Sequence, residues 1–498
     1  MKAFLLYRDQ DFDLQRNLPS NEQALTQDLE LQTLFTAMGL EDKTLLEVAR
    51  KVVLSTLNDV DAIRYRQDIL KDCLKDAAVV REMYNLTVES IEKEKKHYLG
   101  IFSNYPSTIL HRSVDVLQMF VGQLKSLRGV ADEHAHEFQS EGFTRLFAML
   151  QAELSEEYFA DIQQHLRELA FRGGVLTSAA LGKGNKANIL VLRKPNDRQG
   201  LVQRIFAKRS PSCSFYISER DEAGAKALAE LRDRGVNLVA NALAQSTDHI
   251  LSFFQMLRTE LAFYVGCLNL SERLAVKGEP TCFPEPSGPQ DRRLAYRGLY
   301  DVCLTLSMEP RAVGNDANAD GKDLMIITGA NQGGKSTLLR AMGLAQLMMQ
   351  SGMFVPAESF RSNVCNALFT HYKREEDTTM KSGKLDEELK RMSEIVDSLI
   401  PNSILLFNES FAATNEREGS EIARQIVGAL SEKGIKVFYV THLHDFAHSF
   451  FLKKMEKAIF LRAERKDSGA RSFKILEGEP LETSFGEDLY TKIFGNGS

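Results

Sequence analysis

The pattern of apolar and polar residues divides the chain into a helical first part and a later part where short apolar runs alternate with helical patterns. Long mixtures of polar and apolar residues, with few prolines or glycines, run through residues 22–98 and 105–172. Such stretches are typical of helices. A break is expected at residues 104–106. We therefore expect roughly the first 180 residues to be helical.

A second helical pattern covers residues 243–274, where six apolar residues recur at alternating steps of four and three. They are Ile250, Phe254, Leu257, Leu261, Tyr264 and Leu268. This spacing keeps one apolar seam along a helix of about 30 residues, or about 45 Å. Two interpretations stay open: a helix packed along its own domain, or a rigid lever that carries motion between domains.

Short apolar runs predict strands on both sides of this helix. The composition changes near residues 172–174, and the runs at 188–192 and 214–218 predict two strands of a small subdomain. The proline- and glycine-containing residues 278–289 end the long helix.

A strand is expected at residues 299–306 and a flexible polar turn at 314–321. The remainder of the chain alternates strands and helices, as a mostly parallel sheet requires.

The composition is that of an ordinary soluble protein, with 43% hydrophobic and 26% charged residues and a net charge of -6. The six cysteines are scattered and form no C-x-x-C pair, which indicates free thiols in a reducing compartment. No stretch reaches the roughly 20 apolar residues of a membrane span. We expect a cytoplasmic protein with no membrane partner.

One segment departs from the acidic balance of the chain. Residues 183–209 contain eight basic residues and one acidic residue, a net charge of +7, which leaves −13 for the rest. The basic residues are Lys183, Lys186, Arg193, Lys194, Arg198, Arg204, Lys208 and Arg209. They are candidate DNA contacts, because lysine and arginine bind the phosphate backbone without reading its sequence. The alternative is a solvated basic face, or one that pairs with an acidic surface of the same chain.

Residues 329–337, Gly-Ala-Asn-Gln-Gly-Gly-Lys-Ser-Thr, follow an apolar run at 324–327. The spacing G-x-x-x-x-G-K-[ST] is that of a phosphate-binding loop between a buried strand and a helix, here expected at about 336–349. Glycines let backbone N–H groups turn inward around phosphate oxygens, and the helix directs its positive end at the same anion. Lys335 is expected to reach the β- and γ-phosphates, and Ser336 to bind Mg²⁺.

The loop thus predicts ATP with Mg²⁺ as the ligand. The loop residues expected to bind the nucleotide are Gly329, Ala330, Asn331, Gln332, Gly333, Gly334, Lys335, Ser336 and Thr337.

Two further apolar strands end in candidate catalytic groups. The strand at 404–407 leads to Asn408 and Glu409, and the strand at 437–440 leads to Thr441 and His442. At the position of Asn408 such a site normally has a residue that holds Mg²⁺, and at the position of Glu409 one that polarises the attacking water. Asn408 brings no negative charge, so metal affinity and turnover should fall, while Glu409 keeps the group that activates water. His442 can sense the γ-phosphate, although a lone histidine is usually structural.

Together these segments resemble the ATPase domain of the MutS family over about residues 310–495. The resemblance is carried by the runs at 325–337, 354–358, 406–419, 441–444 and 483–486. A weaker resemblance extends to the family's core-domain motif, which Asp-Ala-Ile-Arg-Tyr-Arg-Gln-Asp at 61–68 resembles. The long helix before residue 278 resembles the family's lever.

This resemblance implies a homodimer with two composite ATP sites. In that family a serine of one subunit faces the γ-phosphate bound by the other. Ser382 matches that position, although the usual Ser-Thr is Ser-Gly here. Asn315 aligns with a position that contacts the nucleotide base, and Thr414 and Asn415 lie in the segment that crosses the dimer interface. Asn408 departs from the family's usual aspartate.

The resemblance also sets the expected layout: a multidomain chain with an α-helical core and lever region followed by an α/β P-loop (ABC-type) ATPase domain. We expect a helical core at 1–182, a small basic clamp-like subdomain at 183–236, a lever helix and linker at 237–290, and the ATPase domain at 291–498. Since the core-like motif already appears by residue 61, we expect no mismatch-reading domain or connector before it.

The function expected from these features is an ATP-hydrolysing dimer of the MutS type that acts on double-stranded or branched DNA, in repair or recombination, without reading mismatches. The alternative is a nucleotide-gated protein-interaction switch with slow or no hydrolysis, which Asn408 motivates. A transporter ATPase subunit is disfavoured because no Leu-Ser-Gly-Gly-Gln signature follows residue 336. Mismatch repair itself is disfavoured by the expected absence of the reading domain.

Overall fold

The computed structural model describes residues 1–97, 105–171, 174–185, 187–194, 213–309, 311–374, 383–465 and 471–480. The chain divides into two compact units. The first unit comprises Met1–Ala3, Arg81–His136 and Thr144–Arg258, and the second comprises Phe4–Val80, Glu137–Phe143 and Thr259–Ser498. Within the described residues, no helix combines the length and the apolar character that a membrane crossing requires.

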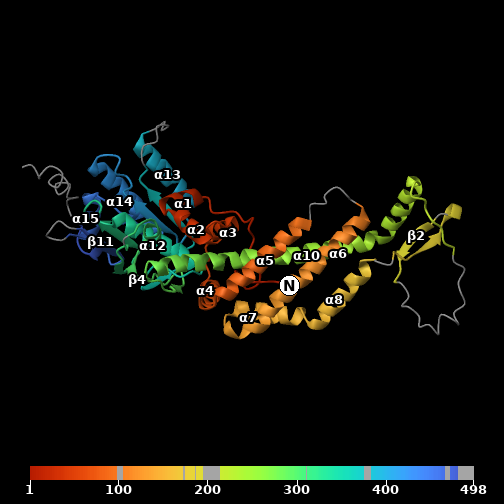
Figure 1. The fold of residues 1–498 in the computed structure, drawn as a ribbon. Helices are drawn as coiled ribbons and strands as arrows, with labels where there is room; N and C mark the ends of the chain where they lie inside the picture. The colour runs from red at the N-terminus through yellow and green to blue at the C-terminus, as the bar shows by residue number, and fades with distance from the viewer. Residues whose placement is uncertain are drawn as a thin grey trace, which may run out of the picture. The chain divides into compact units, whose positions relative to one another are not determined.

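The first unit is mainly helical, as the sequence predicts (Figure 1). It contains most of α5 (Ala77–His97), α6 (Pro106–His134), most of α7 (Glu141–Glu153), α8 (Glu156–Leu169) and the first part of α10 (Glu222–Val276). Proline at the first position of α6 fits a helix start, because that N–H has no partner within the helix. Helices α6 and α10 pack through Phe120 and Phe254, whose ring centroids lie 5.5 Å apart.

Helix α10 is much longer than the seam predicts. It spans 55 residues, or about 80 Å, and begins 21 residues before the predicted start at residue 243. The side chain of Asp221 accepts a hydrogen bond from the N–H of Gly224 at 2.8 Å, which caps the first turn. The turns at residues 222–235 contain good helix formers such as alanine and leucine but no sustained apolar seam, so the periodicity did not predict them. Val236 and Ala240 continue the seam and are buried against Leu110 of α6.

The small subdomain contains one of its two predicted strands. Strand β2 (Ala187–Leu192) pairs antiparallel with β1 (Thr177–Leu181), which the sequence did not predict. The predicted strand at 214–218 is wrong, because that segment belongs to no strand. Phe215 and Tyr216 are 82% and 85% exposed there, so among the described residues the aromatic run that suggested a strand packs against no sheet.

The second unit holds a six-stranded sheet with the order β12-β11-β6-β10-β9-β8. All neighbouring pairs are parallel except β11 and β12, which confirms the mostly parallel sheet. The strands are β6 (Leu324–Thr328), β8 (Leu368–Tyr372), β9 (Ile404–Asn408), β10 (Lys436–Val440), β11 (Ala458–Arg465) and β12 (Arg471–Glu477).

Four helices accompany this sheet: α12 (Lys335–Gln350), α13 (Lys384–Ser398), α14 (Glu416–Glu432) and α15 (His444–Leu452). Helix α12 contacts β9 and β10. A core cluster joins the strands to residues of α14 and α15. In it the ring of Tyr439 stacks on that of Phe407, with centroids 4.8 Å apart, and lies tilted against that of Phe446, also at 4.8 Å.

A second sheet has the order β3-β7-β4-β5. Its strands are β3 (Glu285–Ser287), β4 (Leu294–Leu299), β5 (Asn315–Asn318) and β7 (Ser359–Asn363). Two predictions are wrong here. The strand expected at 299–306 is not formed, because β4 ends at Leu299 and Val302–Ser307 forms helix α11. The Asp301 side chain caps this helix by accepting a hydrogen bond from the N–H of Leu304 at 3.0 Å. The polar turn expected at 314–321 contains β5, which pairs with β4.

Four N-terminal helices belong to the same compact unit as the sheets: α1 (Glu22–Asp28), α2 (Leu31–Gly39), α3 (Lys43–Leu54) and α4 (Val60–Lys75). Asn21, just before α1, donates to the carbonyl of Leu368 in β8 at 2.7 Å. Gln350 at the end of α12 exchanges two 2.8 Å hydrogen bonds with the backbone of Leu57. The four-part domain layout given above remains a prediction.

Candidate nucleotide-binding site

The loop between β6 and α12 (residues 329–334, hereafter the glycine loop) depends on its glycines. Gly329 and Gly334 have φ of 111° and 92°, a region that L side chains rarely adopt. A Cβ on Gly329 would lie 2.9 Å from the backbone nitrogen of Ala463, and one on Gly333 2.7 Å from the Ala463 side chain. The loop therefore packs directly on β11, and α12 begins at Lys335 as expected.

The Lys335 side chain binds the backbone of this loop. Its Nζ donates to the carbonyl oxygens of Gly329 and Ala330, both at 2.9 Å. Burial lowers the pKa of Lys335 to about 8, while the Glu409 carboxylate raises it and the Arg471 cation lowers it further. A buried ammonium held on neutral carbonyls gains from an anionic ligand, because charge-assisted hydrogen bonds are the stronger kind.

Parallel pairing brings the other predicted groups to the same edge of the sheet. Val440 at the end of β10 lies opposite Ile327 of β6 on one side and Asn408 of β9 on the other. Carboxyl ends of parallel strands meet at one edge. The residues that follow these strands, Glu409 and His442, therefore lie beside the glycine loop.

Two side-chain pairs form at this edge. The hydroxyl of Ser336 donates to Oδ1 of Asn408 at 2.8 Å, and Nε2 of His442 donates to Oε1 of Glu409 at 2.8 Å. The hydrogen bond from His442 holds the pKa of Glu409 below its ordinary value, against the opposing effect of burial. Glu409 is thus ionised and oriented by His442.

The donors present fit a magnesium ion. Ser336 Oγ and Asn408 Oδ1 are adjacent oxygen atoms, and Mg²⁺ prefers oxygen ligands. Both are neutral, however, so they supply none of the negative charge that an aspartate would bring at position 408.

Strand β12 adds groups to the loop that the sequence did not single out. Arg471 donates through Nη1 to Oε1 of Gln332. Asn315, for which a contact with the base stays a prediction, is buried and hydrogen-bonded to β12: its Nδ2 donates to the carbonyl of Phe473 at 3.3 Å, and its Oδ1 accepts from the N–H of Ile475 at 2.7 Å. Arg471 carries no motif, so only the pairing of β12 beside the loop reveals it.

The remaining residues predicted to bind the nucleotide differ in exposure. Asn331, Gln332 and Ser336 are exposed, and Ala330 and Thr337 are half-buried. Ser382, predicted to face a partner's phosphate, lies outside the described residues, as do residues 483–486.

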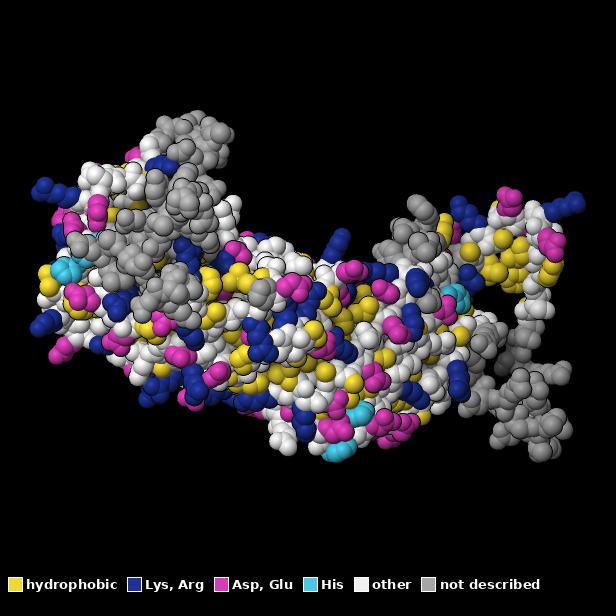
Figure 2. All heavy atoms as spheres, turned by 60° about the vertical axis from the view of Figure 1, so that its left-hand side comes forward, with side chains coloured by type: hydrophobic (Ala, Val, Ile, Leu, Met, Phe, Trp, Pro, Cys, Tyr) yellow, Lys and Arg dark blue, Asp and Glu magenta, His cyan; other side chains and the backbone are white. Residues whose placement is uncertain are grey.

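The basic segment is described only in part. Lys183 is exposed, Arg193 donates to the hydroxyl of Ser178 at 2.9 Å, and Lys194 pairs with Glu168 at 2.9 Å. Lys186, Arg198, Arg204, Lys208 and Arg209 lie outside the described residues. On the face in Figure 2, basic side chains are interspersed with acidic ones.

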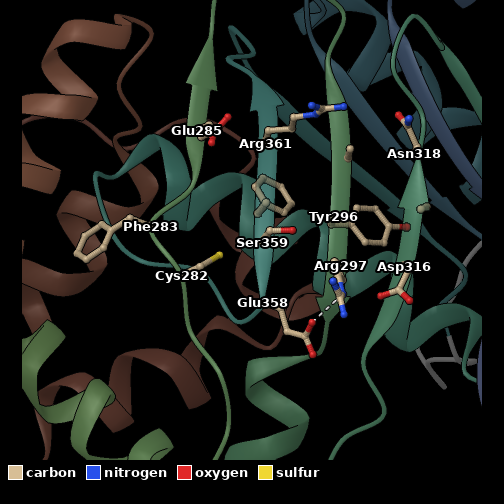
Figure 3. Close-up of a pocket in the computed structure, with 13 residues that line it drawn as sticks. Cys282, Phe283, Glu285, Tyr296, Arg297, Asp316, Asn318, Glu358, Ser359 and Arg361 are labelled. Carbon is tan, nitrogen blue, oxygen red and sulfur yellow. Dashed lines mark ion pairs between the residues drawn. The ribbon is translucent and has the colours of Figure 1, made fainter.

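A cavity of about 650 Å³ lies over the four-stranded sheet (Figure 3). Its polar lining includes an ion pair between Arg297 and Glu358 at 2.9 Å. The lining contains none of the residues predicted to bind nucleotide, so it plays no part in the candidate site.

Two family models match the chain: the MutS2 N-terminal domain over residues 58–277 and MutS domain V over residues 325–492. The second match contains the whole glycine loop, Asn408, Glu409 and His442. The first contains the motif at 61–68 and the whole of α10.

Curated relatives agree. The chain is 26% identical over 291 residues to the DNA mismatch repair protein MutS of Chloroflexus aurantiacus, covering 54% of this chain and 30% of that protein. It is 25% identical over 263 residues to MutS of Streptococcus thermophilus, covering 52% and 31%. It is 32% identical over 173 residues to MutS of Porphyromonas gingivalis, covering 32% and 19%. The chain thus matches less than a third of the length of these relatives. On the two domain matches and these relatives, the chain belongs to the MutS family.

Proposed function

We propose that this MutS-family chain binds ATP with Mg²⁺ and hydrolyses it to ADP and phosphate. We further propose that it works as a cytoplasmic homodimer on double-stranded or branched DNA, in repair or recombination without mismatch reading. The observation that carries the ATPase proposal is the meeting of Lys335, the Ser336–Asn408 pair and the Glu409–His442 pair at one sheet edge.

The glycine loop and Lys335 would bind the phosphates. The N-terminus of α12 offers unpaired backbone N–H groups to an anion, and Lys335 would exchange its two carbonyl partners for phosphate oxygens. Ser336 and Asn408 would hold Mg²⁺, directly or through water. When bound, the ion supplies positive charge to the phosphate oxygens.

Glu409 is the group we assign to water activation. Its carboxylate would accept the proton of a water whose oxygen attacks the γ-phosphorus, while the bond from that phosphorus to the β-phosphate oxygen breaks and ADP leaves. His442 holds the carboxylate in place through the 2.8 Å hydrogen bond. It also keeps the pKa of Glu409 low, so the base is ready at neutral pH.

DNA binding rests on the basic segment at 183–209 and on the relatives, which are named as DNA mismatch repair proteins. Contacts to the phosphate backbone are electrostatic and independent of sequence. The pairing of Lys194 with Glu168 means that DNA would have to compete with an internal carboxylate for that lysine.

ATP turnover measured with duplex, branched and single-stranded DNA across a salt series tests this proposal. We expect one DNA structure to stimulate turnover, with binding that weakens steeply with salt. Neutralising Arg193, Lys194, Lys208 and Arg209 to glutamine should lower the slope of log K against log salt by about one for each phosphate that the variant no longer neutralises.

The matched control neutralises four lysines that are exposed in the second unit: Lys390, Lys433, Lys453 and Lys454. It should leave the salt slope unchanged. Binding that is insensitive to salt, or an equal fall in slope for both variants, would remove the assignment of this segment.

A nucleotide-gated switch with slow or no hydrolysis is the second candidate, and the neutral Ser336–Asn408 pair favours it. Comparison of the wild type with Asn408→Asp separates the two. A switch predicts negligible wild-type turnover that the substitution raises. Brisk wild-type turnover that Glu409→Gln abolishes would leave the switch without support.

A further inference from the structure

Two cationic side chains approach the glycine loop from different elements. Lys335 reaches it from the start of α12, and Arg471 reaches it from the start of β12. Arg471 is exposed, and its contact on the loop is the neutral amide oxygen of Gln332. A hydrogen bond from a guanidinium to a neutral acceptor is readily exchanged for a stronger one to phosphate.

The site offers little negative charge to balance these two cations. Asn408 is neutral, and its Oδ1 accepts a hydrogen bond from the Ser336 hydroxyl at 2.8 Å. The carboxylate of Glu409 is paired with His442. In a site with an aspartate at 408, a triphosphate without metal would face that second carboxylate, and like charges at such short range repel strongly. Asn408 removes that repulsion.

We propose that Arg471 is a phosphate-binding residue and that this site therefore holds a nucleoside triphosphate even when Mg²⁺ is removed. The inference rests on the proposed nucleotide site but goes beyond it, since it separates nucleotide retention from the metal that hydrolysis needs. Arg471 places beside the phosphates a positive charge that Mg²⁺ would otherwise have to supply. Arginine suits this task because its planar fork matches phosphate oxygens.

Titration of a fluorescent ATP analogue in Mg²⁺ and in EDTA tests the proposal. We expect the wild-type Kd to rise no more than about threefold in EDTA, which is less than 1 kcal/mol. Asn408→Asp should lose at least about tenfold in EDTA, because a carboxylate then faces the phosphates. Arg471→Ala should lose about ten- to a hundredfold in EDTA, the range of a hydrogen bond to a charged group.

Two further variants serve as controls. Arg471→Lys keeps the charge and should recover part of the affinity. Arg297→Ala removes an exposed arginine from the four-stranded sheet and should bind as the wild type does in both conditions.

The outcomes are distinct. A wild-type Kd that rises more than about tenfold in EDTA, or an Arg471→Ala variant that binds normally, overturns the inference but leaves the proposed function standing. A wild type that binds no nucleotide with or without Mg²⁺ overturns both.

Discussion

Glu260 is a buried carboxylate in α10 whose charge should make the stability of the protein depend on pH. It is 0% exposed and accepts hydrogen bonds from the backbone N–H groups of Leu5, Leu6 and Phe12. These bonds fasten the N-terminal segment to the helix. Burial raises the pKa of Glu260 to about 7, with a further contribution from the Asp11 carboxylate, and the three backbone bonds lower it only in part.

The magnitude follows from the difference between this pKa and the ordinary value of 4.5, which corresponds to roughly 3 kcal/mol. Between these pH values the folded chain holds a proton that the unfolded chain has lost. The stabilising contribution of the protonated carboxyl is therefore complete below pH 4.5 and is lost as pH rises through about 7.

Glu260→Gln removes the ionisation, so the difference in unfolding free energy between variant and wild type should increase by roughly 3 kcal/mol from about pH 4.5 to pH 8. Urea unfolding followed by circular dichroism measures it at each pH. Glu230→Gln, at an exposed position of the same helix, is the control and should show a difference that stays constant. If the Glu260→Gln difference is also constant with pH, the assignment of this proton to Glu260 is refuted.

Two other predictions concern packing and catalysis. A Cβ on Gly343 of α12 would lie 2.7 Å from Leu406 and 2.9 Å from Leu29, so Gly343→Val should lower the unfolding free energy by about 1–3 kcal/mol. Gly428→Ala in α14 meets open space and should be neutral or stabilise by up to about 1 kcal/mol in the same urea assay. His442→Ala removes the main cause of the lowered pKa of Glu409. The acidic limb of kcat/KM should then move to higher pH, and an unmoved limb would dissociate His442 from the base.

The sequence predicted what local patterns determine. The glycine loop, the strands at 404–407 and 437–440 and the helix after the loop all lie where expected. Each has a strong signal, either a required glycine or a run of apolar residues buried on both faces. Parallel pairing then places Asn408 and His442 beside the loop.

Hydrophobic periodicity did not predict elements that depend on helix propensity, on a cap or on strand pairing. The first turns of α10 have helix formers without a seam, and β1 becomes a strand by pairing with β2. The run at 299–306 looks continuous, yet Asp301 caps a new helix within it. Arg471 acquires its place at the loop only because β12 folds back on β11. No local signal marks that return.

The most direct test of the account is ATP turnover by Glu409→Gln beside the wild type, with nucleotide affinity measured on the same samples. Oε1 of Glu409 lies 2.8 Å from Nε2 of His442 at the edge of the glycine loop. Loss of a positioned general base slows a reaction by about a hundredfold or more. We predict that fall in kcat with a Kd for ATP changed by less than about threefold, because Lys335 and the loop still bind the phosphates. If Glu409→Gln hydrolysed ATP as fast as the wild type, that result would contradict the proposed site.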